Sequence, residues 1–442
     1  MEVNLTKGNI LKSLILFSIP IIIGNIFQQM YNIFDTLIVG KLLGNIALTA
    51  VGSSYALMVL ISSIIIGFTM GASVSFSHYY GANSHDKLKS AIFNSFIFVL
   101  VVSLVLNILS YLLLDKILVW INIPSEALVM TREYLSIIFI GIFFIFLYNF
   151  VASILRSIGN TKIALYFLIC STLINIYLDY AFIKYFNMGV AGAAWATIIA
   201  QVFASLGITM YLVIKRKDLL PKKEHMEFEK YVLMDIIDNS SLTAIQQSIM
   251  NFGILMIQGL VNSYGLIVSA AFATVVKIDA FAYMPAQDFG NAFASFVAQN
   301  NGANNKERID KGLKLSMLVS IIFCLISSIL VYIFAENLML IFVKESEIEV
   351  LKVGVNYLRT EGVFYIGIGI LFLWYGYYRG LSRGKQSIIL TVISLGLRVL
   401  LANILHVYYG TFGIWISIVI GWFVADLYGY YIYRKFKKLE IA

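Results

Sequence analysis

The sequence predicts an all-α integral membrane protein with twelve transmembrane helices, arranged as two six-helix lobes that repeat one another. The first reason is composition, since 60% of the 442 residues are hydrophobic and only 13% are charged, against roughly 25% charge in an average soluble domain. The second is that apolar runs of about 18 residues or more, each long enough to cross a bilayer, recur along the whole chain. The third is a similarity between the two halves of the chain.

Twelve predicted spans follow one another with short connections. The N-terminal segment enters the first apolar run without a small-residue cleavage site, so we expect this span to remain in the mature protein. The spans lie near residues 14–39, 46–78, 91–114, 131–155, 161–183, 189–214, 235–260, 267–299, 312–334, 353–378, 386–405 and 412–433.

The basic residues are distributed unequally between the two sides of the predicted bundle. If both termini lie in the cytoplasm, 23 of the 32 Lys and Arg residues fall on the inner side and seven on the outer side, with Lys277 and Arg398 inside spans. Because positive charge gathers on the inner side of membrane proteins, we expect a multi-pass protein of the cytoplasmic membrane with both termini inside. Contact with anionic lipid headgroups explains the net charge of +8, and we predict no nucleic-acid partner.

The most basic loop, after the sixth span, divides the chain into two similar halves. GANSHDKLKSA at 81–91 recurs as GANNKERIDKG at 302–312, and Tyr134 matches Tyr357 at a separation of 223 residues. An even number of spans in each half gives both repeats the same orientation, with a substrate site expected between them. The predicted parts are an N-terminal lobe over 1–214, a cytoplasmic linker over 215–230 and a C-terminal lobe over 231–442.

A polar stripe runs along one span of each half. Counted at about 100° per residue, four polar residues of the first span fall within an arc of about 80°, and three of the seventh within about 40°. The stripes are Asn25, Gln28, Asn32 and Asp35 in the first span, and Gln247, Asn251 and Gln258 in the seventh. We predict that Gln28, Asn32, Gln247 and Asn251 line a substrate cavity. The alternative is that the amides only join neighbouring helices through hydrogen bonds.

Asp35 is an acid near the outer end of an otherwise uncharged span. A charge within the bilayer costs about 2.5–3.5 kcal/mol on insertion scales, which makes this residue a functional candidate. Asp179, in the fifth span, lies at the same expected depth, roughly 7–8 Å from the helix end at 1.5 Å per residue. Asn175 is one turn from Asp179, and Thr197 enters from the sixth span at a similar level. We therefore expect these four side chains to meet.

Several segments, taken in this order, resemble the multidrug and toxic compound extrusion (MATE) family, in its bacterial NorM and DinF types. They are YNIFDTLIVG in the first span, YGAN and NNGAN closing the second and eighth, LRSIGNTK after the fourth, NIYLDYAFI in the fifth and GVAGAAWATIIAQ opening the sixth. The similarity runs through nearly the whole chain. It implies the MATE fold and a cation-coupled antiporter that exports organic cations or other amphipathic compounds by alternating access.

The resemblance also implies a role for the four residues expected to meet in the N-terminal lobe. In the family the matching Asp, Asn, Asp and Thr form a cation-coupling site, which transfers to Asp35, Asn175, Asp179 and Thr197. Their oxygens suit a small hard cation such as Na⁺, and two neighbouring carboxyl groups in a low dielectric cannot both ionise freely, which suits a proton. The alternative is that structural hydrogen bonds satisfy each acid separately. We expect no cofactor beyond the coupling ion, H⁺ or Na⁺.

The second half has apolar residues where the first half has this acid pair, and it carries other charges within its spans. These are Lys277, Asp279, Asp288, Glu361 and Arg398, of which Arg398 matches Asn175 in the repeat. They either pair with one another inside the lobe or place a substrate or second cation site at Asp288 or Glu361. We add Asp288, Glu361 and Arg398 to the predicted substrate cavity. Asp426, near the inner end of the last span, is expected to pair with nearby basic residues.

Two other functions compete with transport of amphipathic compounds. An enzyme is disfavoured because the chain has no HExxH motif and no Cys/His constellation. A flippase for lipid-linked saccharides, from the same superfamily, should line its cavity with several basic residues, whereas we place only Lys277 and Arg398 inside the bilayer, away from the ends of the spans. We therefore expect a multidrug exporter that contacts membrane lipids and small amphipathic substrates and works as a monomer.

Cysteine labelling tests the predicted orientation. In a chain whose two natural cysteines are replaced, Lys223→Cys should react with an impermeant thiol reagent only from the cytoplasmic side, and Asn337→Cys only from outside. The reason is that the loop at Lys223 carries the densest basic charge. Labelling of Lys223→Cys from outside in intact cells would reverse the assignment.

Overall fold

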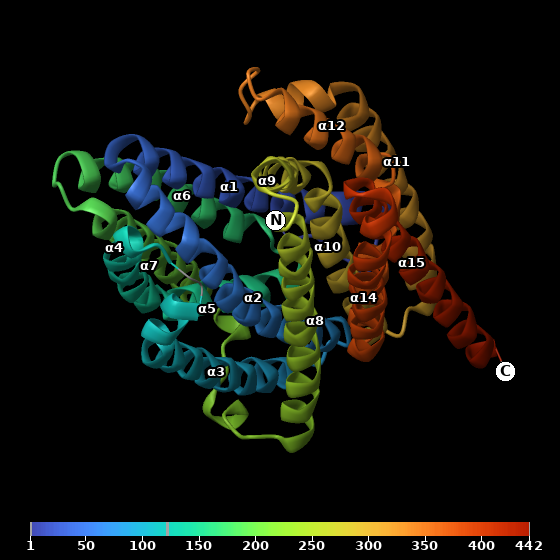
Figure 1. Cartoon of the computed structure of the whole chain (residues 1–442). Helices are drawn as coiled ribbons and strands as arrows, with labels where there is room; N and C mark the ends of the chain where they lie inside the picture. The colour runs from blue at the N-terminus through green and yellow to red at the C-terminus, as the bar shows by residue number, and fades with distance from the viewer. Residues whose placement is uncertain (1, 121–122, 442) are drawn as a thin grey trace. The chain divides into compact units, whose positions relative to one another are not determined.

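The computed structural model describes residues 2–120 and 123–441, which form helices and no strand (Figure 1). The predicted all-α class is confirmed. The helices of the first half are α1 (Ile10–Leu43), α2 (Asn45–Gly81), α3 (His85–Trp120), α4 (Ser125–Ile138), η1 (Phe139–Gly141), α5 (Ile142–Ser157), α6 (Lys162–Lys184) and α7 (Gly189–Lys215), followed by η2 (Lys217–Leu219) and η3 (Lys223–His225). Those of the second half are α8 (Lys230–Asn262), α9 (Leu266–Ala282), α10 (Met284–Gly302), α11 (Lys306–Leu340), α12 (Ile348–Gly362), α13 (Tyr365–Gly380), α14 (Gly384–Tyr409) and α15 (Thr411–Ile441).

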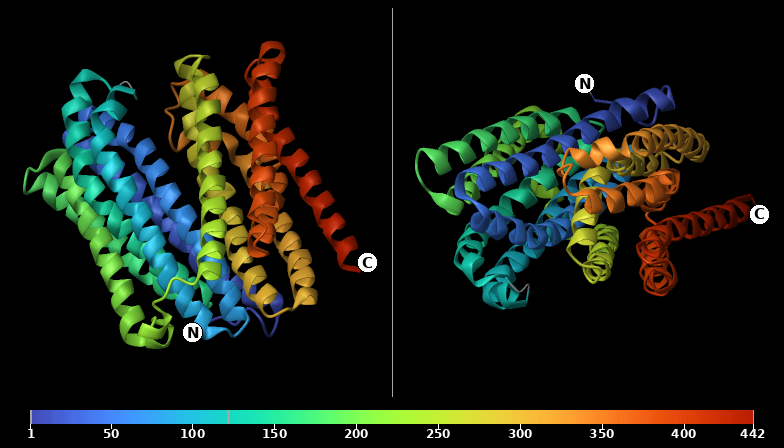
Figure 2. Two further views of the ribbon diagram at one scale, coloured as in Figure 1. Left: turned by 90° about the horizontal axis from the view of Figure 1, so that it is seen from below. Right: turned by 45° about the horizontal axis from the view of Figure 1, so that its top comes forward.

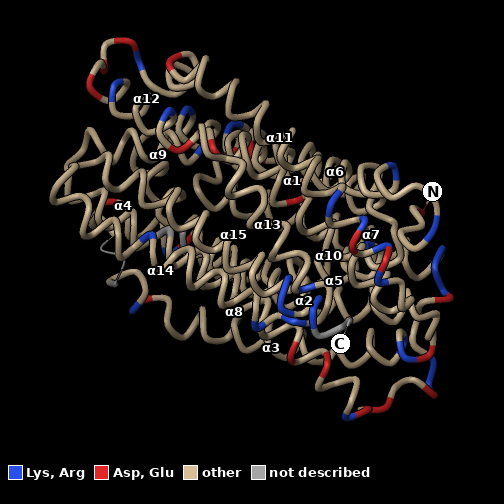
Figure 3. Tube along the Cα trace, turned by 90° about the vertical axis from the view of Figure 1, so that its right-hand side faces the viewer, with Lys and Arg blue, Asp and Glu red and all other residues tan. Residues whose placement is uncertain are grey.

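The predicted spans lie on these helices, although their number is approximate. Among the described residues ten helices are long and apolar enough to cross a membrane, and the bent pair α9–α10 makes an eleventh. The predicted span 353–378 lies on α12 and α13, two shorter helices that do not meet the same test. Charged residues gather mainly at helix ends and in connections, and the long stretches between them are largely uncharged (Figure 3).

The bend between α9 and α10 has a local cause. The two helices meet at 45°, and Pro285 stands at the start of α10. Because proline has no backbone N–H, it cannot continue the hydrogen bonding of the preceding helix, whereas it is well suited to a first helical turn. The bend brings Tyr283 against Tyr365 and Phe372, with ring centroids 5.7 and 6.2 Å apart.

The chain forms two compact units. Unit 1 comprises residues 2–5 and 19–244 apart from 121–122, and unit 2 comprises residues 6–18 and 245–441. This division falls inside α1 and inside α8, whereas the boundary expected from the repeat is the loop 215–230. The first part of each of these two helices therefore belongs to a different unit from its remainder.

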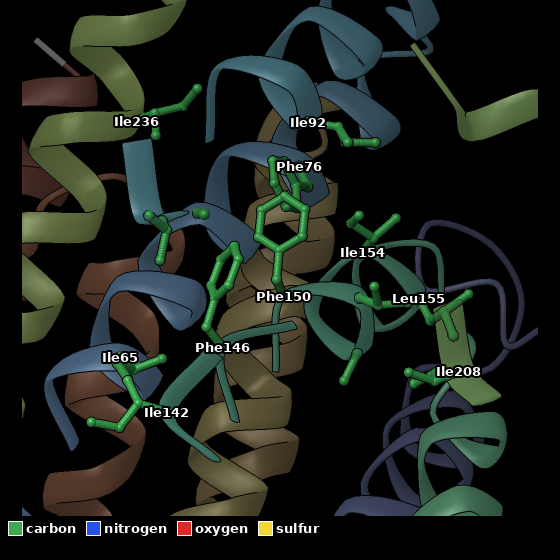
Figure 4. Packing of buried hydrophobic residues seen from close by; sticks show 14 of the residues in the cluster. Ile65, Phe76, Ile92, Ile142, Phe146, Phe150, Ile154, Leu155, Ile208 and Ile236 are labelled. Atoms are coloured by element: carbon green, nitrogen blue, oxygen red, sulfur yellow. The ribbon is translucent and has the colours of Figure 1, made fainter. Parts of the chain in front are cut away.

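Aromatic and branched side chains fill the core of unit 1 (Figure 4). Phe76 of α2 meets Phe150 of α5 edge-on, with ring centroids 6.1 Å apart, and Phe146 lies 5.7 Å from Phe150. Ile236, from the first part of α8, is fully buried in the same cluster. Within a membrane, close packing of this kind rather than removal from water holds helices together.

Two glycines let α2 approach the first part of α8. A Cβ atom on Gly71 would lie 2.3 Å from the carbonyl oxygen of Asn239, and one on Gly67 would lie 2.5 Å from Cα of Ala244. The Asn239 side chain donates hydrogen bonds to Ser75 of α2 and to Asp235, both at 3.1 Å. Small residues and buried hydrogen bonds thus allow the first part of α8 to pack closely against α2 in unit 1.

Unit 2 uses the same small-residue packing between α10 and α13. A Cβ atom on Gly376 would lie 2.2 Å from the carbonyl oxygen of Gly290. On another side of the unit, Tyr357 of α12 is stacked on Trp415 of α15, with ring centroids 4.0 Å apart, and lies 5.7 Å from Phe272. Figure 2 shows α14 beside α15, which completes the unit.

Gly71→Ala should destabilise the protein, because the added methyl group would meet the backbone of α8. We expect a loss of about 1–3 kcal/mol, typical of overpacking, seen as a lower midpoint of thermal unfolding in detergent. Gly52→Ala is the matched control, since Gly52 lies in the same helix and a methyl group added there would have nothing within 4 Å. Equal melting of both variants would show that α2 and α8 do not pack as closely as described.

Candidate functional site

Two carboxyl groups lie together inside unit 1. Asp35 is near the Leu43 end of α1 and is 6% exposed, and Asp179 is near the Lys184 end of α6 and fully buried. Their side chains lie within interaction distance of each other. Apart from the contact between the two carboxyl groups themselves, Oδ1 of Asp35 and both carboxyl oxygens of Asp179 have no hydrogen-bond partner among the described residues. The structure therefore brings the two acids together, and no other described residue donates a hydrogen bond to these three oxygens.

An amide and two hydroxyl groups border the acid pair. The side-chain amide of Asn175 donates to Oγ1 of Thr197 at 3.5 Å, and the Tyr31 hydroxyl lies 2.9 Å from the same oxygen. Asn175 and Thr197 are buried, and Oδ1 of Asn175 has no hydrogen-bond partner within the described part of the chain. The Tyr31 hydroxyl lies where the charges of Asp35 and Asp179 act on it, so it connects the acid pair to Thr197 and Asn175 and brings the predicted cation-coupling residues of α1, α6 and α7 into one place.

Two tyrosines of the site were not predicted from the sequence. Tyr31 lies four residues before Asp35 and so shares its face of α1, a spacing that is visible in YNIFD. Tyr134 of α4 is buried where it feels the charges of both Asp35 and Asp179. Nothing in the sequence around Tyr134 sets it apart, other than its match to Tyr357 in the repeat.

An apolar cluster closes the site towards the ends of its helices. Val39 lies one turn beyond Asp35 on α1, and Ile183 lies one turn beyond Asp179 on α6. On α7, Ala193 lies one turn before Thr197. All three are buried in one cluster, which also contains Tyr134. On this side the acid pair is therefore closed off by groups that do not solvate charge, and the polar groups that could help to bind a cation are those of Asn175, Thr197 and Tyr31.

This arrangement suits a small cation or a proton. Two carboxylates in an apolar enclosure repel each other and have lost their hydration, so both cannot remain ionised without a compensating positive charge. A proton shared by the pair or a Na⁺ ion bound by carboxylate, amide and hydroxyl oxygens would supply that charge. No group of three or more His, Cys, Asp or Glu occurs among the described residues. The ligand set is thus two acids with neutral oxygens, a weakly charged set for a divalent metal.

The amides predicted to line a substrate cavity belong to different units. Gln28 and Asn32 lie in unit 1, Gln28 exposed and Asn32 half-buried with a 3.5 Å hydrogen bond to Gln29. Gln247 and Asn251 are half-buried in unit 2. Their role as a shared cavity therefore stays a prediction.

Unit 2 buries a second group of charges, around Asp279 of α9 and Glu361 of α12. Both acids are almost fully buried, at 4% and 3% exposure. The Tyr365 hydroxyl donates to Asp279, and the Tyr357 hydroxyl is a hydrogen-bond partner of Glu361. The positive charge of Arg398, on α14, acts on both acids. The pairing of these charges inside the lobe stays a prediction, and Oε2 of Glu361 has no hydrogen-bond partner among the described residues.

The remaining charged residues predicted within spans of the second half, Asp288 and Lys277, lie on different helices. Asp288 is buried on α10, whereas Lys277 is exposed with its ammonium 5.9 Å from the ring centroid of Phe342. The expectation that Asp426 pairs with basic residues is wrong, because neither of its oxygens has a hydrogen-bond partner among the described residues. Its helix packs against α13 and α14, so the carboxyl group faces the bundle and not the basic inner end of α15.

A protein-family model also detects the internal repeat, because it matches each half of the chain separately. The family model called MatE matches the chain twice, over residues 20–181 and 243–404. The chain is 30% identical over 443 residues to the "Probable multidrug resistance protein YpnP" of Bacillus subtilis (strain 168), covering 99% of this chain and 98% of that protein. It is 26% identical over 416 residues to the "Probable multidrug resistance protein NorM" of Thermotoga maritima, covering 92% and 89%.

Solved structures with a similar fold cover nearly the whole chain. One is described as the outward-facing conformation of a multidrug resistance MATE family transporter of the MOP superfamily, with a TM-score of 0.92, 25% identity, and coverage of 98% of this chain and 97% of that one. Another is a MOP superfamily transporter from Pyrococcus furiosus, with a TM-score of 0.92, 26% identity and the same coverage.

Proposed function

This chain belongs to the MatE family, and from that premise we propose that it exports amphipathic, mainly cationic, organic compounds from the cytoplasm by cation-coupled antiport. It is a multi-pass membrane protein whose relatives are multidrug resistance proteins. In this proposal it transports its substrate unchanged, so no step of covalent catalysis is involved. Both termini lie in the cytoplasm, a position supported by the bias of basic residues.

The observation that carries the proposal is the enclosed pair of Asp35 and Asp179. Three buried carboxyl oxygens without a donor from any other described residue are expensive in an apolar enclosure. A structural pair would be expected to have donors for these oxygens, as the Tyr365 hydroxyl provides for Asp279 in unit 2. The unpaired oxygens instead favour a site that takes up and releases a cation during each transport cycle.

Cation exchange at this site would drive the cycle through the charge of the acid pair. A ligand shifts a conformational equilibrium only by its different affinity for the two states. The enclosed site favours the loaded, neutralised pair, and an opened site that admits water favours the ionised pair. The apolar cluster of Val39, Ile183 and Ala193 then acts as the barrier that must part before water reaches the carboxyl groups. Export follows if substrate binds the state from which the cation has left.

Asp35→Asn should abolish gradient-driven export while leaving the protein folded in the membrane. The amide has nearly the same shape but cannot take up a proton or provide a charged ligand. We expect export from proteoliposomes under an imposed proton or sodium gradient to fall to the rate seen without a gradient. Asp115→Asn is the matched control, because Asp115 is an exposed acid in a surface ion pair with Arg132. Unchanged gradient-driven export by Asp35→Asn would refute the assignment.

Thr197→Ala distinguishes the two candidate ions. Bound Na⁺ would lose a hydroxyl ligand, whereas a proton on a carboxyl group needs no such ligand. If sodium is the coupling ion, the concentration of Na⁺ that gives half-maximal export should rise about tenfold, a loss of about 1.4 kcal/mol in binding. If the proton is the coupling ion, export should change little. Thr197→Ser keeps the hydroxyl and should behave as the wild type, so an equal defect in both variants would indicate a packing effect instead.

A further inference from the structure

The last helix, α15, is longer than a bilayer core requires. About 20 helical residues, at 1.5 Å each, cross a hydrocarbon core about 30 Å thick. Counted from Thr411, where α15 begins, that length ends near Tyr430. The remainder of the helix, residues 431–441, therefore extends into the layer of lipid headgroups and the water beyond it.

Exposed tyrosines stand at both limits of this crossing. Tyr408 and Tyr409 come just before α15, and Tyr430 and Tyr431, which are 51% and 60% exposed, lie where the counted length ends. Tyrosine is enriched where the hydrocarbon core meets the headgroups, because its ring is apolar and its hydroxyl group is polar. Helix length and the positions of the tyrosines thus agree that the headgroup layer begins at Tyr430.

One exposed face of α15 changes in character as it passes this level. Counted at about 100° per residue, positions 427, 431, 434, 435 and 438 fall within an arc of about 100°. All five side chains are exposed, and in order they are Leu427, Tyr431, Arg434, Lys435 and Lys438. The face therefore passes from aliphatic to aromatic to basic, in the order in which a lipid leaflet passes from acyl chain to phosphate. It lies at the edge of unit 2 in Figures 1 and 2.

The other side of the same segment is fastened to unit 2. Tyr433 and Lys437 both donate to Asp310 of α11, at 3.2 and 2.8 Å. The guanidinium group of Arg383 stacks on the ring of Phe436, 3.8 Å from its centroid. Contacts with two other parts of the unit thus hold this end of α15 in one orientation, with the basic face outward.

The chain provides no counter-charge for the outward face. None of the three basic residues there forms an ion pair with another residue whose side chain is described. Lys437, on the inward side, is neutralised by Asp310. At the end of α7, the last span of the first half, Arg216 pairs with both Glu2 and Asp218. The basic face of α15 is therefore a group of neighbouring like charges that repel one another unless an anion binds among them.

The direction of the side chains favours an anion in the headgroup layer. Side chains on a helix lean towards its N-terminus, so those at the end of α15 lean back towards the bilayer. The guanidinium group of Arg434 accordingly lies 6.0 Å from the ring centroid of Tyr430, one turn nearer the core. Guanidinium groups bind phosphate through two parallel hydrogen bonds, and ammonium groups bind it as point charges.

We propose that the basic face of α15, formed by Arg434, Lys435 and Lys438 above Tyr430 and Tyr431, is a binding site for the headgroup of an anionic phospholipid. The lipid phosphate lies among the three cations, and its acyl chains lie along the apolar part of the same face. A zwitterionic lipid binds less well, because its own ammonium group meets the three cations. This inference needs only that the end of α15 lies at a membrane surface, and it does not rest on the proposed function.

Two simpler roles for these cations make a different prediction. They would fix only the orientation of the last span during insertion, or they would only compensate the partial negative charge at the C-terminal end of the helix. Neither role gives the folded protein a preference between lipid headgroups. The proposal is therefore tested by lipid binding to the folded protein, and not by insertion or stability.

The experiment counts lipids bound to the purified full-length protein by native mass spectrometry. Phosphatidylglycerol and phosphatidylcholine with identical acyl chains are the two probes. The wild type should bind phosphatidylglycerol more tightly, and the combined variant Arg434→Gln, Lys435→Gln and Lys438→Gln should lose that preference. We expect its affinity for the tightest-bound phosphatidylglycerol to fall about fivefold for each basic residue, or about 100-fold in all. A wild type that binds the two lipids equally would overturn the proposal.

A matched variant removes the same charge elsewhere. Lys215→Gln, Lys217→Gln and Lys223→Gln, combined, neutralise three exposed lysines in a segment that also carries acids, and this variant should retain the wild-type preference. An equal loss in both variants would show an effect of total charge and not of a site. Arg434→Lys, Lys435→Arg and Lys438→Arg, combined, keep the charge and should bind as the wild type.

Free phosphate is the other anion of this chemistry, and lipid-free protein distinguishes it. Inorganic phosphate should bind no better than chloride at the same ionic strength, because it has no acyl chains to lie along the apolar part of the face. Phosphate that binds this protein tightly, and binds the three-glutamine variant of α15 weakly, would assign the face to a soluble anion and overturn the lipid site.

If the variants of α15 do not insert stably, the wild type alone still tests the site. Photoactivatable phosphatidylglycerol in a membrane should cross-link to residues 423–438 more often than photoactivatable phosphatidylcholine does, as mapped by peptide mass spectrometry. Equal labelling of this segment by the two lipids would contradict the proposal. No step requires export, so failure of the proposed function would leave these results unchanged.

Discussion

The cost of an ionised carboxylate in an apolar environment shapes both units of this protein. Asp35 and Asp179, like Asp279 and Glu361, lie where hydrocarbon and packed side chains replace water. In such surroundings every buried charge needs a positive partner, a proton or several hydrogen-bond donors. In unit 2 the Tyr365 hydroxyl donates to Asp279 and the Tyr357 hydroxyl is a partner of Glu361. In unit 1 three carboxyl oxygens have no donor from another described residue.

The helices were predictable because a membrane protein must satisfy its backbone within each span. Long apolar runs therefore translate directly into helices, and the predicted spans lie on α1 to α15. The breaks within spans were not predictable from hydropathy. Pro285 is a visible signal for the bend at Tyr283. Gly362 stands at the separation of α12 from α13, but glycine is frequent within membrane spans and does not by itself mark a break.

The acids of the candidate site were predictable because charge within a span is rare, whereas the tyrosines around them were not. Aromatic residues make up 14% of the chain, so Tyr134 differs from the others only through its place in the structure. For Asp426 the residue was noticed in the sequence, but the partner predicted for it was wrong. Its position near the basic end of α15 suggested an ion pair, but Arg434 lies eight residues further along the helix, about 12 Å at 1.5 Å per residue, and Asp426 lies near Tyr375 of α13 instead.

The sharing of α1 and α8 between the units bears on how such a protein could have arisen from two copies of a half-length ancestor. A chain that ended in the loop 215–230 would lack residues 230–244, against which Gly67 and Gly71 pack. The other piece would lack residues 6–18, which belong to unit 2. Two separate ancestral chains would therefore have had to exchange the beginnings of their first helices, as in a domain-swapped dimer. Gene fusion would then have joined partners that already depended on each other to fold, and neither half would later have been free to survive alone.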